Sequence, residues 1–231
     1  ELPKVRASKL DEIYDVDQKY YEALQESAET CIYNGKEIVT LDTELKERMG
    51  EQRFLVDDEK NIGYTMKVER NKDGEIKESQ LLSFKTGKKA DGKCSVVAED
   101  VDVMMGAKDG DIYYLTDMDE GMGDLYCNEE LIDSDVMIGT LEFTKEQKYP
   151  IYKTDYNTSK NLFTLKMFDG KNAKVIADDA FDYKVVDEKK IAVLVDYDDD
   201  DSTGTLKLYR GKDKLIELDD DVICLFGGMY N

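Results

Sequence analysis

The sequence contains no histidine and no tryptophan, and only two of its 231 residues are proline. Because histidine is the commonest general base and transition-metal ligand, its absence excludes a Ser-His-Asp triad, a Cys-His nucleophile and any zinc site that needs an imidazole. No hydrophobic run approaches the ~18 residues of a membrane helix, and no signal peptide is visible. Because the sequence begins with Glu1 rather than Met, we expect a processed or trimmed protein.

Positive charge is also scarce. Lys and Arg number 32 against 53 Asp and Glu, so the net charge is −21. A surface this negative repels nucleic-acid phosphates and anionic membranes, which argues against both as partners. The charge does not exclude cations, basic proteins or neutral sugars as partners. Solubility alone is, however, a sufficient reason for such a charge.

Cysteine is limited to four residues, none of them in a CxxC pair. Zinc-ribbon and thioredoxin-like sites are therefore excluded. The even count leaves disulfide pairing open, but the cysteines lie in or beside strand-like runs, where small buried hydrophobes are common. We expect free structural thiols at Cys31, Cys94, Cys127 and Cys224.

The N-terminal part differs from the rest. Residues 1–10 are polar and read as a linker, and the next stretch carries apolar residues at helical spacing. Asp11 stands where a helix cap is expected. We therefore predict two parts, a linker with one α-helix in residues 1–30 and a β-domain in residues 31–231.

A repeat of about 42 residues runs through the predicted β-domain. Its clearest mark is an aromatic strand: Phe84, Tyr126, Phe168 and Tyr209 follow one another at intervals of 42, 42 and 41 residues. A polar turn, usually Gly-Lys, comes next, and then an apolar strand that runs into a short acidic step. Four short strands in a unit of this length are typical of a β-propeller blade.

The repeat predicts an all-β, β-propeller-like domain of about five four-stranded blades, the first of them partial. Complete units are predicted to begin near Asn61, Asp111, Tyr149 and Ile191, after a partial unit from Cys31 to about Lys60. A blade has two apolar faces and must stack on its neighbours to bury them. The apolar tail 223–226 is a candidate to complete the partial blade and close the ring. The alternatives are an open ring, missing upstream blades, or an antiparallel sandwich.

The unit has an Ile-Tyr-Tyr opening at 112–114, a Leu-Tyr strand at 125–126, and a Leu-Ile strand that runs into an acidic step and Val at 131–136 and 215–222. In these features it resembles bacterial TolB-like propeller repeats. It resembles more closely the extracytoplasmic propeller-like domains of unknown function in Firmicute lipoproteins and membrane-anchored proteins. The resemblance covers roughly residues 31–226. It implies an extracytoplasmic, cell-surface or secreted scaffold that binds ligands or proteins, and it supplies no catalytic residues.

Two Asp-rich hairpins are the best candidates for chemistry. Alternating carboxylates can converge on a hard cation such as Ca²⁺, which makes a loose calcium site conceivable at Asp117, Asp119, Asp196, Asp198 and Asp200. The EF-hand pattern fails, because counting from Asp196 the sixth residue is Asp201 and the twelfth is Lys207. The competing interpretation is a solvated turn, since Asp is a habitual turn residue, and the same applies to the acidic step.

Three functions are compatible with these observations. The first is a non-catalytic binding module that recognises a protein or a cell-wall or glycan ligand through loops on one face of the propeller. The second is a sensory or structural ectodomain of a membrane-anchored protein. The third is a glycoside hydrolase using an acidic pair, but no pair is marked out and we expect no enzyme. Most tyrosines of the repeat are expected to pack between blades, and a subset to form a binding surface.

Overall fold

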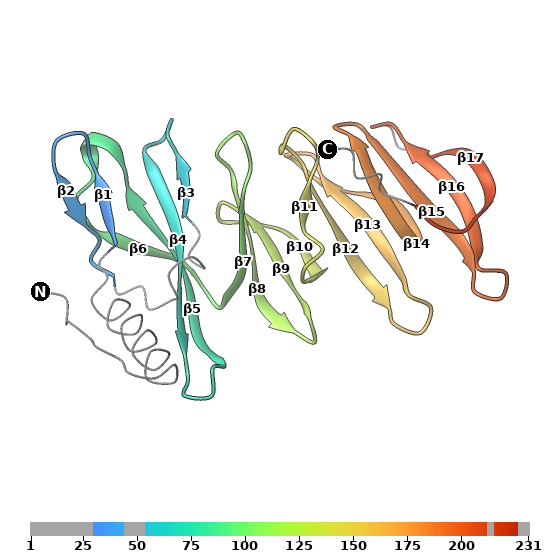
Figure 1. The fold of residues 1–231 in the computed structure, drawn as a ribbon, viewed down its shortest axis with the longest axis horizontal. Coiled ribbons are helices and arrows are strands. Elements are labelled where there is room, and N and C mark those ends of the chain that lie inside the picture. Colours follow the sequence, from blue (N-terminus) through green and yellow to red (C-terminus); the bar gives the residue numbers. More distant parts are fainter. Residues whose placement is uncertain (1–29, 44–53, 212–214, 226–231) are drawn as a thin grey trace, which may run out of the picture. The chain divides into compact units, whose positions relative to one another are not determined.

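A computed structural model describes residues 30–43, 54–211 and 215–225 of the chain (Figure 1). The linker and helix predicted for residues 1–30 lie almost entirely outside these ranges, so the helix prediction stays untested. The described residues contain no α-helix, and their single helical turn is a 3-10 segment, η1 (Gly87–Lys89). Within the same ranges, no helix has the length and hydrophobicity needed to span a bilayer.

The chain divides into two compact units, Glu1–Asp100 and Val101–Asn231. The first unit contains β1 (Cys31–Tyr33), β2 (Ile38–Thr40), β3 (Phe54–Asp57), β4 (Ile62–Arg70), β5 (Ile76–Lys85) and β6 (Cys94–Glu99). Strands β1 and β2 form a two-stranded hairpin, and β3 to β6 form an antiparallel sheet in sequence order. The Asp42 carboxylate, just after β2, accepts a hydrogen bond of 2.7 Å from the Cys94 backbone N–H, which ties the hairpin to β6.

The second unit continues the same pattern. Its strands are β7 (Val101–Gly106), β8 (Ile112–Asp119), β9 (Met122–Cys127), β10 (Glu130–Met137), β11 (Glu142–Phe143), β12 (Pro150–Asn157), β13 (Leu162–Phe168), β14 (Ala173–Asp187), β15 (Lys190–Asp198), β16 (Thr203–Tyr209) and β17 (Ile216–Val222). Strands β7 to β10 form one four-stranded sheet, and β11 to β17 form a seven-stranded sheet. The long strand β14 pairs with β13 through its first half and with β15 through its second half.

The seven-stranded sheet therefore consists of two four-stranded sheets that share β14. Each resembles a propeller blade, as do β3–β6 and β7–β10. The strands predicted to open the complete units, β4, β8, β12 and β15, begin within one residue of the predicted positions, at Ile62, Ile112, Pro150 and Lys190. Each is, however, the second strand of its four-stranded sheet and not the first, so the predicted unit boundaries are offset from the sheets by one strand. The all-β repeat of antiparallel four-stranded sheets is thus confirmed. Of the tail proposed to close the ring, residues 223–225 belong to no strand among the described residues and Phe226 lies outside them.

The core of the second unit lies on both faces of the β11–β14 sheet. One face contributes Tyr152 to a buried cluster with Tyr113, Leu115 and Leu125 of the preceding sheet. The other face contributes Ile151, Phe163 and Leu165 to a second cluster with Val193 and Val195 of the next sheet, among others. This is the two-faced burial that a blade requires, because one small sheet cannot cover both of its apolar faces.

The acidic step has a backbone explanation. Asp100, Asp135, Asp179 and Asp221 occupy matching places in four successive repeats, and their φ angles are 52°, 55°, 47° and 53°. Asp tolerates this left-handed region better than most residues, because its short polar side chain can bond locally. At Asp100 and Asp179 the step is no open loop: β7 begins directly after Asp100, and β14 runs through Asp179 without a break. At each of these two places, one residue with a left-handed backbone conformation lies where the chain passes from one sheet to the next.

None of the four cysteines forms a disulfide in the described structure. Cys127 is buried beside Tyr113, Cys94 and Cys224 are partly exposed, and Cys31 is exposed. Burial raises the pKa of Cys127 and of Cys94 to about 11 each, and the nearby negative charges of Asp111 and Asp42 act in the same direction. These thiols are therefore protonated at neutral pH.

Candidate functional site

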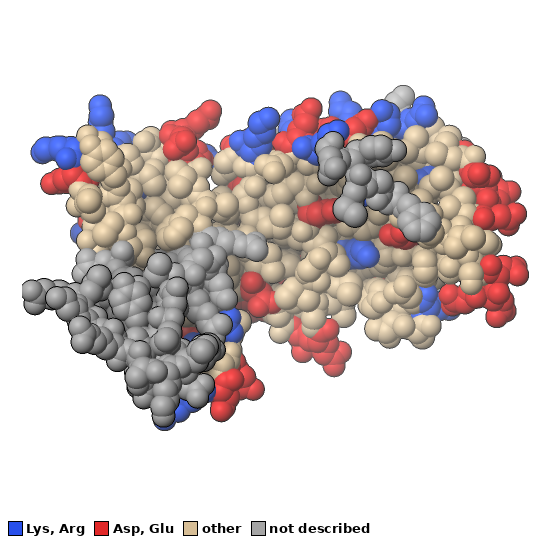
Figure 2. Space-filling model, in the orientation of Figure 1, with Lys and Arg blue, Asp and Glu red and all other residues tan. Residues whose placement is uncertain are grey.

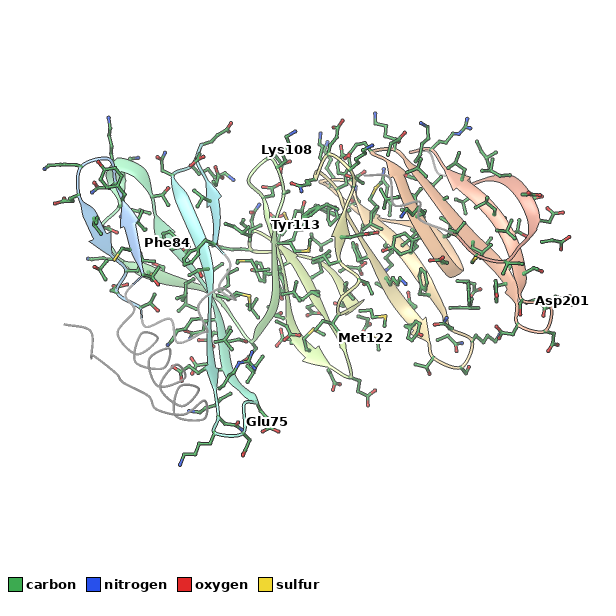
Figure 3. All side chains as sticks on the ribbon, in the orientation of Figure 1. Glu75, Phe84, Lys108, Tyr113, Met122 and Asp201 are labelled. Carbon is green, nitrogen blue, oxygen red and sulfur yellow. The ribbon has the colours of Figure 1, made fainter. Side chains whose placement is uncertain are left out.

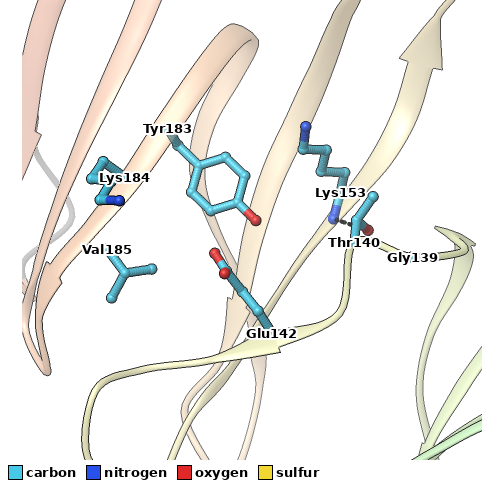
Figure 4. Close-up of a pocket in the computed structure, with 7 residues that line it drawn as sticks. All are labelled: Gly139, Thr140, Glu142, Lys153, Tyr183, Lys184 and Val185. Atoms are coloured by element: carbon cyan, nitrogen blue, oxygen red, sulfur yellow. Dashed lines mark hydrogen bonds between the residues drawn. The ribbon is translucent and has the colours of Figure 1, made fainter. Parts of the chain in front are cut away.

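A cavity of about 410 Å³ opens in the second unit, between the β11–β12 edge of one sheet and the second half of β14 (Figure 4). It lies next to the end of the apolar cluster that contains Phe163 and Val193. Seven residues line it, namely Gly139, Thr140, Glu142, Lys153, Tyr183, Lys184 and Val185. Most of these come from strands, and only Gly139 and Thr140 belong to a loop, the one between β10 and β11.

The Thr140 side chain fixes this loop to the neighbouring strand. Its hydroxyl donates a hydrogen bond of 2.6 Å to the Met137 carbonyl and accepts one of 3.2 Å from the Lys153 backbone N–H. Gly139 precedes it with a φ of +74°, a conformation that suits glycine. The loop is thus tied to the end of β10 and to β12, two residues before Glu142 joins the lining of the cavity.

Lys153 stands at a core position of the repeat. Asp117, Asp155 and Asp196 are matching residues with positive φ in three repeats. Lys153 lies two residues before Asp155. The residues at the same place before Asp117 and Asp196 are Leu115 and Leu194, and both are fully buried. The apolar part of the Lys153 side chain replaces the leucine, and the amine continues beyond it. Figure 4 shows this side chain on the cavity wall.

The Lys153 ammonium rests on aromatic rings. Its Nζ lies 3.9 Å from the centroid of the Phe163 ring and 5.4 Å from that of the Tyr183 ring, and the two rings meet edge to face at 6.0 Å. Cation–π contacts of this kind favour the charged form. Nevertheless, burial lowers the pKa of Lys153, while the charges of Asp182 and Glu142 oppose that shift. In the described part of the chain, no hydrogen-bond acceptor or ion-pair partner contacts Nζ.

Glu142 and Tyr183 form the opposite wall, and their polar ends point toward one another (Figure 4). Burial raises the pKa of the Tyr183 hydroxyl, and the adjacent negative charge of Glu142 raises it further. The tyrosine therefore stays a neutral hydrogen-bond donor beside the exposed Glu142 side chain. The cavity thus presents an ammonium on an aromatic bed, a hydroxyl and a carboxylate within one small volume.

The predicted calcium residues of the first hairpin lie on β8. Asp117 adopts a φ of 54° at an irregularity in the β8–β9 pairing, and its carboxylate accepts a hydrogen bond of 2.9 Å from the Thr116 hydroxyl. Thr154 and Asp155 repeat this contact at 2.8 Å in the next sheet. Asp119 is exposed at the end of β8 and pairs with Met122 across the hairpin. The recurring Thr-Asp pair therefore has a structural role in shaping the bulge.

The residues of the second hairpin have protein partners of their own. The Asp196 carboxylate forms an ion pair of 2.8 Å with Lys207, and Asp198 accepts a hydrogen bond of 2.8 Å from the Asp200 backbone N–H. Asp201 lies at the tip of this hairpin (Figure 3), and acidic side chains gather at this end of the second unit in Figure 2. Across the described ranges, no three acidic or cysteine side chains come together as a metal ion needs. The calcium site stays a prediction that this geometry does not support.

The tyrosines of the repeat mostly pack. Tyr113, Tyr114, Tyr152 and Tyr209 are buried, and Tyr197 stacks on Phe181 with ring centroids 3.6 Å apart. Tyr33, by contrast, is 67% exposed. Sequence reasoning missed Glu142, Lys153 and Tyr183. The available signal was Lys153 itself, a charged residue at a position that two other repeats fill with the buried Leu115 and Leu194.

Comparisons with known proteins give distant structural similarities. No protein-family model and no curated protein matches the sequence. The β-propeller domain of the Trilobed protease from Pyrococcus furiosus is 10% identical over 78% of this chain and 62% of that chain, with a TM-score of 0.44. A structure of the eukaryotic initiation factor is 9% identical over 85% of this chain and 50% of that one, with a TM-score of 0.43. An uncharacterized protein from Listeria monocytogenes EGD-e is 8% identical over 71% and 64%, with a TM-score of 0.28. The chain spans between half and about two thirds of the length of these solved chains.

Proposed function

We propose that this protein is a non-catalytic binding module whose ligand enters the cavity between β12 and β14. The observation that carries the proposal is the Lys153 ammonium, placed at a core position of the repeat and lacking an acceptor among the described residues. A polar group that is partly withdrawn from water and left without a hydrogen-bond partner costs free energy. A ligand that supplies the missing acceptor offsets this cost.

The volume and the composition of the cavity support binding of a small molecule or a short segment of a larger one. Small-molecule sites typically measure about 300–1,000 Å³ and combine apolar walls with a few placed polar groups. The Tyr183 ring and Val185 provide the apolar walls, and Glu142, Lys153, Lys184 and Thr140 provide the polar groups. Among the seven lining residues only Glu142 is acidic, so the cavity does not supply the two carboxyl groups that glycoside hydrolysis needs.

The setting that we propose for this module is an extracytoplasmic, TolB-like propeller of about five blades. The resemblance of the repeat supports the compartment. The two-stranded hairpin β1–β2, which has the form of half a blade, supports closure of the ring by strands from elsewhere. A protein or a cell-wall or glycan component is the ligand class that fits this setting.

A binding screen tests the proposal. Thermal shift against panels of soluble glycans and short peptides should find a ligand, because a ligand that binds the native state alone raises its apparent stability. Glu142→Gln and Tyr183→Phe should weaken binding of that ligand. Glu130 is an exposed acidic residue of β10, so Glu130→Gln should leave binding unchanged. Equal weakening by all three variants, or no ligand in either panel, would contradict the proposal and favour a sensory or structural ectodomain.

A further inference from the structure

The lining of the cavity carries both signs of charge, with Lys153 on β12, Lys184 on β14 and Glu142 on β11. Lys153 projects from β12 with its ammonium on the Phe163 ring, and Glu142 projects from β11 toward the Tyr183 hydroxyl. These two charged side chains are not joined as an ion pair. Each is therefore available to a different part of one ligand.

The charge of the whole molecule narrows the choice. A net charge of −21 repels an anionic ligand as it approaches, so a free carboxylate or phosphate is disfavoured. A cationic ligand is disfavoured as well, because the Lys153 ammonium would repel it inside the cavity. A neutral sugar avoids both penalties, but it offers no charged acceptor to the Lys153 ammonium.

A zwitterion satisfies both walls without long-range repulsion, because its net charge is zero. Its carboxylate would accept hydrogen bonds from Lys153 Nζ, and its ammonium would donate to the Glu142 carboxylate. Charge-assisted hydrogen bonds of this kind are shorter and stronger than neutral ones. A cavity of about 410 Å³ lies near the small end of the range for ligand sites, which limits the ligand to about the size of an amino acid or a dipeptide.

We propose that the cavity binds the zwitterionic backbone of a free amino acid or dipeptide, with the ligand carboxylate on Lys153 and the ligand ammonium on Glu142. This inference rests on the proposed function, since it names the ligand class of the same cavity. Tyr183 and Thr140 then act as neighbouring polar contacts, and the Tyr183 ring and Val185 supply the apolar surface.

Isothermal titration calorimetry with alanyl-alanine, its N-acetyl derivative, its C-terminal amide and glucose as a neutral probe tests this assignment. Alanyl-alanine should bind, and each blocked derivative should bind at least about tenfold more weakly, because each loses one charged contact of about 1.4 kcal/mol or more. Glucose should not bind.

Two variants assign each contact to its residue. Lys153→Met keeps the apolar length of the side chain at a position where leucine is normal, so it should fold. It should bind alanyl-alanine and the amide equally. Glu142→Gln should abolish discrimination between alanyl-alanine and its N-acetyl form. Lys171→Met, in the exposed β13–β14 turn, is the matched control and should behave as wild type.

The outcomes separate this inference from the proposed function. If glycans or longer peptides bind in a manner sensitive to Glu142 while alanyl-alanine does not, the zwitterion assignment is wrong and the binding module stands. Equal affinity for the free and blocked dipeptides would also overturn the assignment. If neither panel contains a ligand, both proposals fail.

Discussion

The Tyr152 hydroxyl donates a hydrogen bond of 3.1 Å to the Asp133 carboxylate, which joins β12 to β10 of the preceding sheet. Lys166, opposite Tyr152 on β13, forms an ion pair of 3.0 Å with the same carboxylate. Both side chains of the ion pair are less than one fifth exposed, at 19% and 17%. This polar triad sits beside the apolar cluster that holds the two sheets together.

Removing parts of the triad should destabilise the protein in a definite order. Tyr152→Phe should cost about 1–2 kcal/mol, because one hydrogen bond to a charged group is lost while the ion pair remains. Asp133→Ala should cost roughly 2–3 kcal/mol, because it leaves a half-buried ammonium and a buried hydroxyl without their acceptor. Urea unfolding measures both values.

Tyr114→Phe is the matched control. Tyr114 has the corresponding place in the preceding sheet, opposite Tyr126, and its hydroxyl has no carboxylate acceptor among the described residues. The control should change stability by less than about 0.5 kcal/mol, the usual range for substitutions that remove no named interaction. Equal losses from Tyr152→Phe and Tyr114→Phe would show that the hydrogen bond to Asp133 contributes nothing.

The left-handed conformation of the acidic step predicts that two substitutions of Asp179 differ in their effect on stability. Asp179 is exposed, makes no hydrogen bond through its side chain among the described residues, and has a φ of 47°. Asp179→Gly should therefore change stability by less than about 1 kcal/mol, whereas Asp179→Val should cost about 1–3 kcal/mol, because a β-branched side chain is strained at positive φ. Thermal unfolding of both variants checks this. A valine variant as stable as the glycine variant would refute the backbone explanation of the repeat.

The ionised Asp169 side chain is expected to contribute to folding stability in a way that depends on pH in the acid range. The Lys174 ammonium, 2.6 Å away, and the backbone N–H groups of Asn172 and Lys171 lower the pKa of Asp169 from 3.8 to about 2. A lowered folded-state pKa contributes stability that is fully present above pH 3.8 and is lost as the pH falls toward 2. The destabilisation caused by Asp169→Asn should thus be constant above about pH 5 and shrink between pH 4 and pH 2.

Urea unfolding at several pH values tests that prediction. Asparagine keeps the side-chain oxygen that accepts from the turn backbone, so the comparison isolates the charge. Lys171→Met serves as a control because its ammonium makes no ion pair among the described residues. A destabilisation by Asp169→Asn that stays the same from pH 6 to pH 2 would rule out the Lys174 interaction as a source of stability.

The thiols should differ in reactivity. Cys31 is exposed, whereas Cys127 is 9% exposed and has a pKa of about 11. Iodoacetamide at pH 8 should label Cys31 rapidly and Cys127 only at the rate of local or global unfolding, because the thiolate is the reactive form. Peptide mass spectrometry over time gives the two rates. Labelling of Cys127 as fast as Cys31 in the native protein would contradict its burial.

The repeat could be predicted from the sequence because its marks follow from backbone geometry. The aromatic strand has to fill the space between sheets, and the acidic step has to supply a left-handed residue, so both recur at a fixed interval. The candidate site could not be predicted this way, since it arises where one repeat departs from the others. In the β11–β14 sheet Lys153 stands where the two neighbouring sheets have a buried leucine, and Glu142 and Tyr183 lie outside the aromatic strand and the acidic step that mark the repeat.

The Asp-rich hairpins show the opposite case. They stand out in the sequence, but Asp198 is used by the backbone of its own turn and Asp196 by Lys207. Composition alone cannot separate a carboxylate that shapes a turn from one that awaits a cation. Only the hydrogen-bond partners make that distinction.

The most direct test of the central claim is a titration of ¹⁵N-labelled protein with alanyl-alanine, followed by amide chemical shifts. Binding in the cavity predicts the largest changes at Gly139, Thr140, Lys153 and Tyr183, and their loss in Lys153→Met. The largest changes at the β15–β16 hairpin or along β17, with residues 139–142 and 183–185 unaffected, would contradict the assignment of the cavity as the binding site.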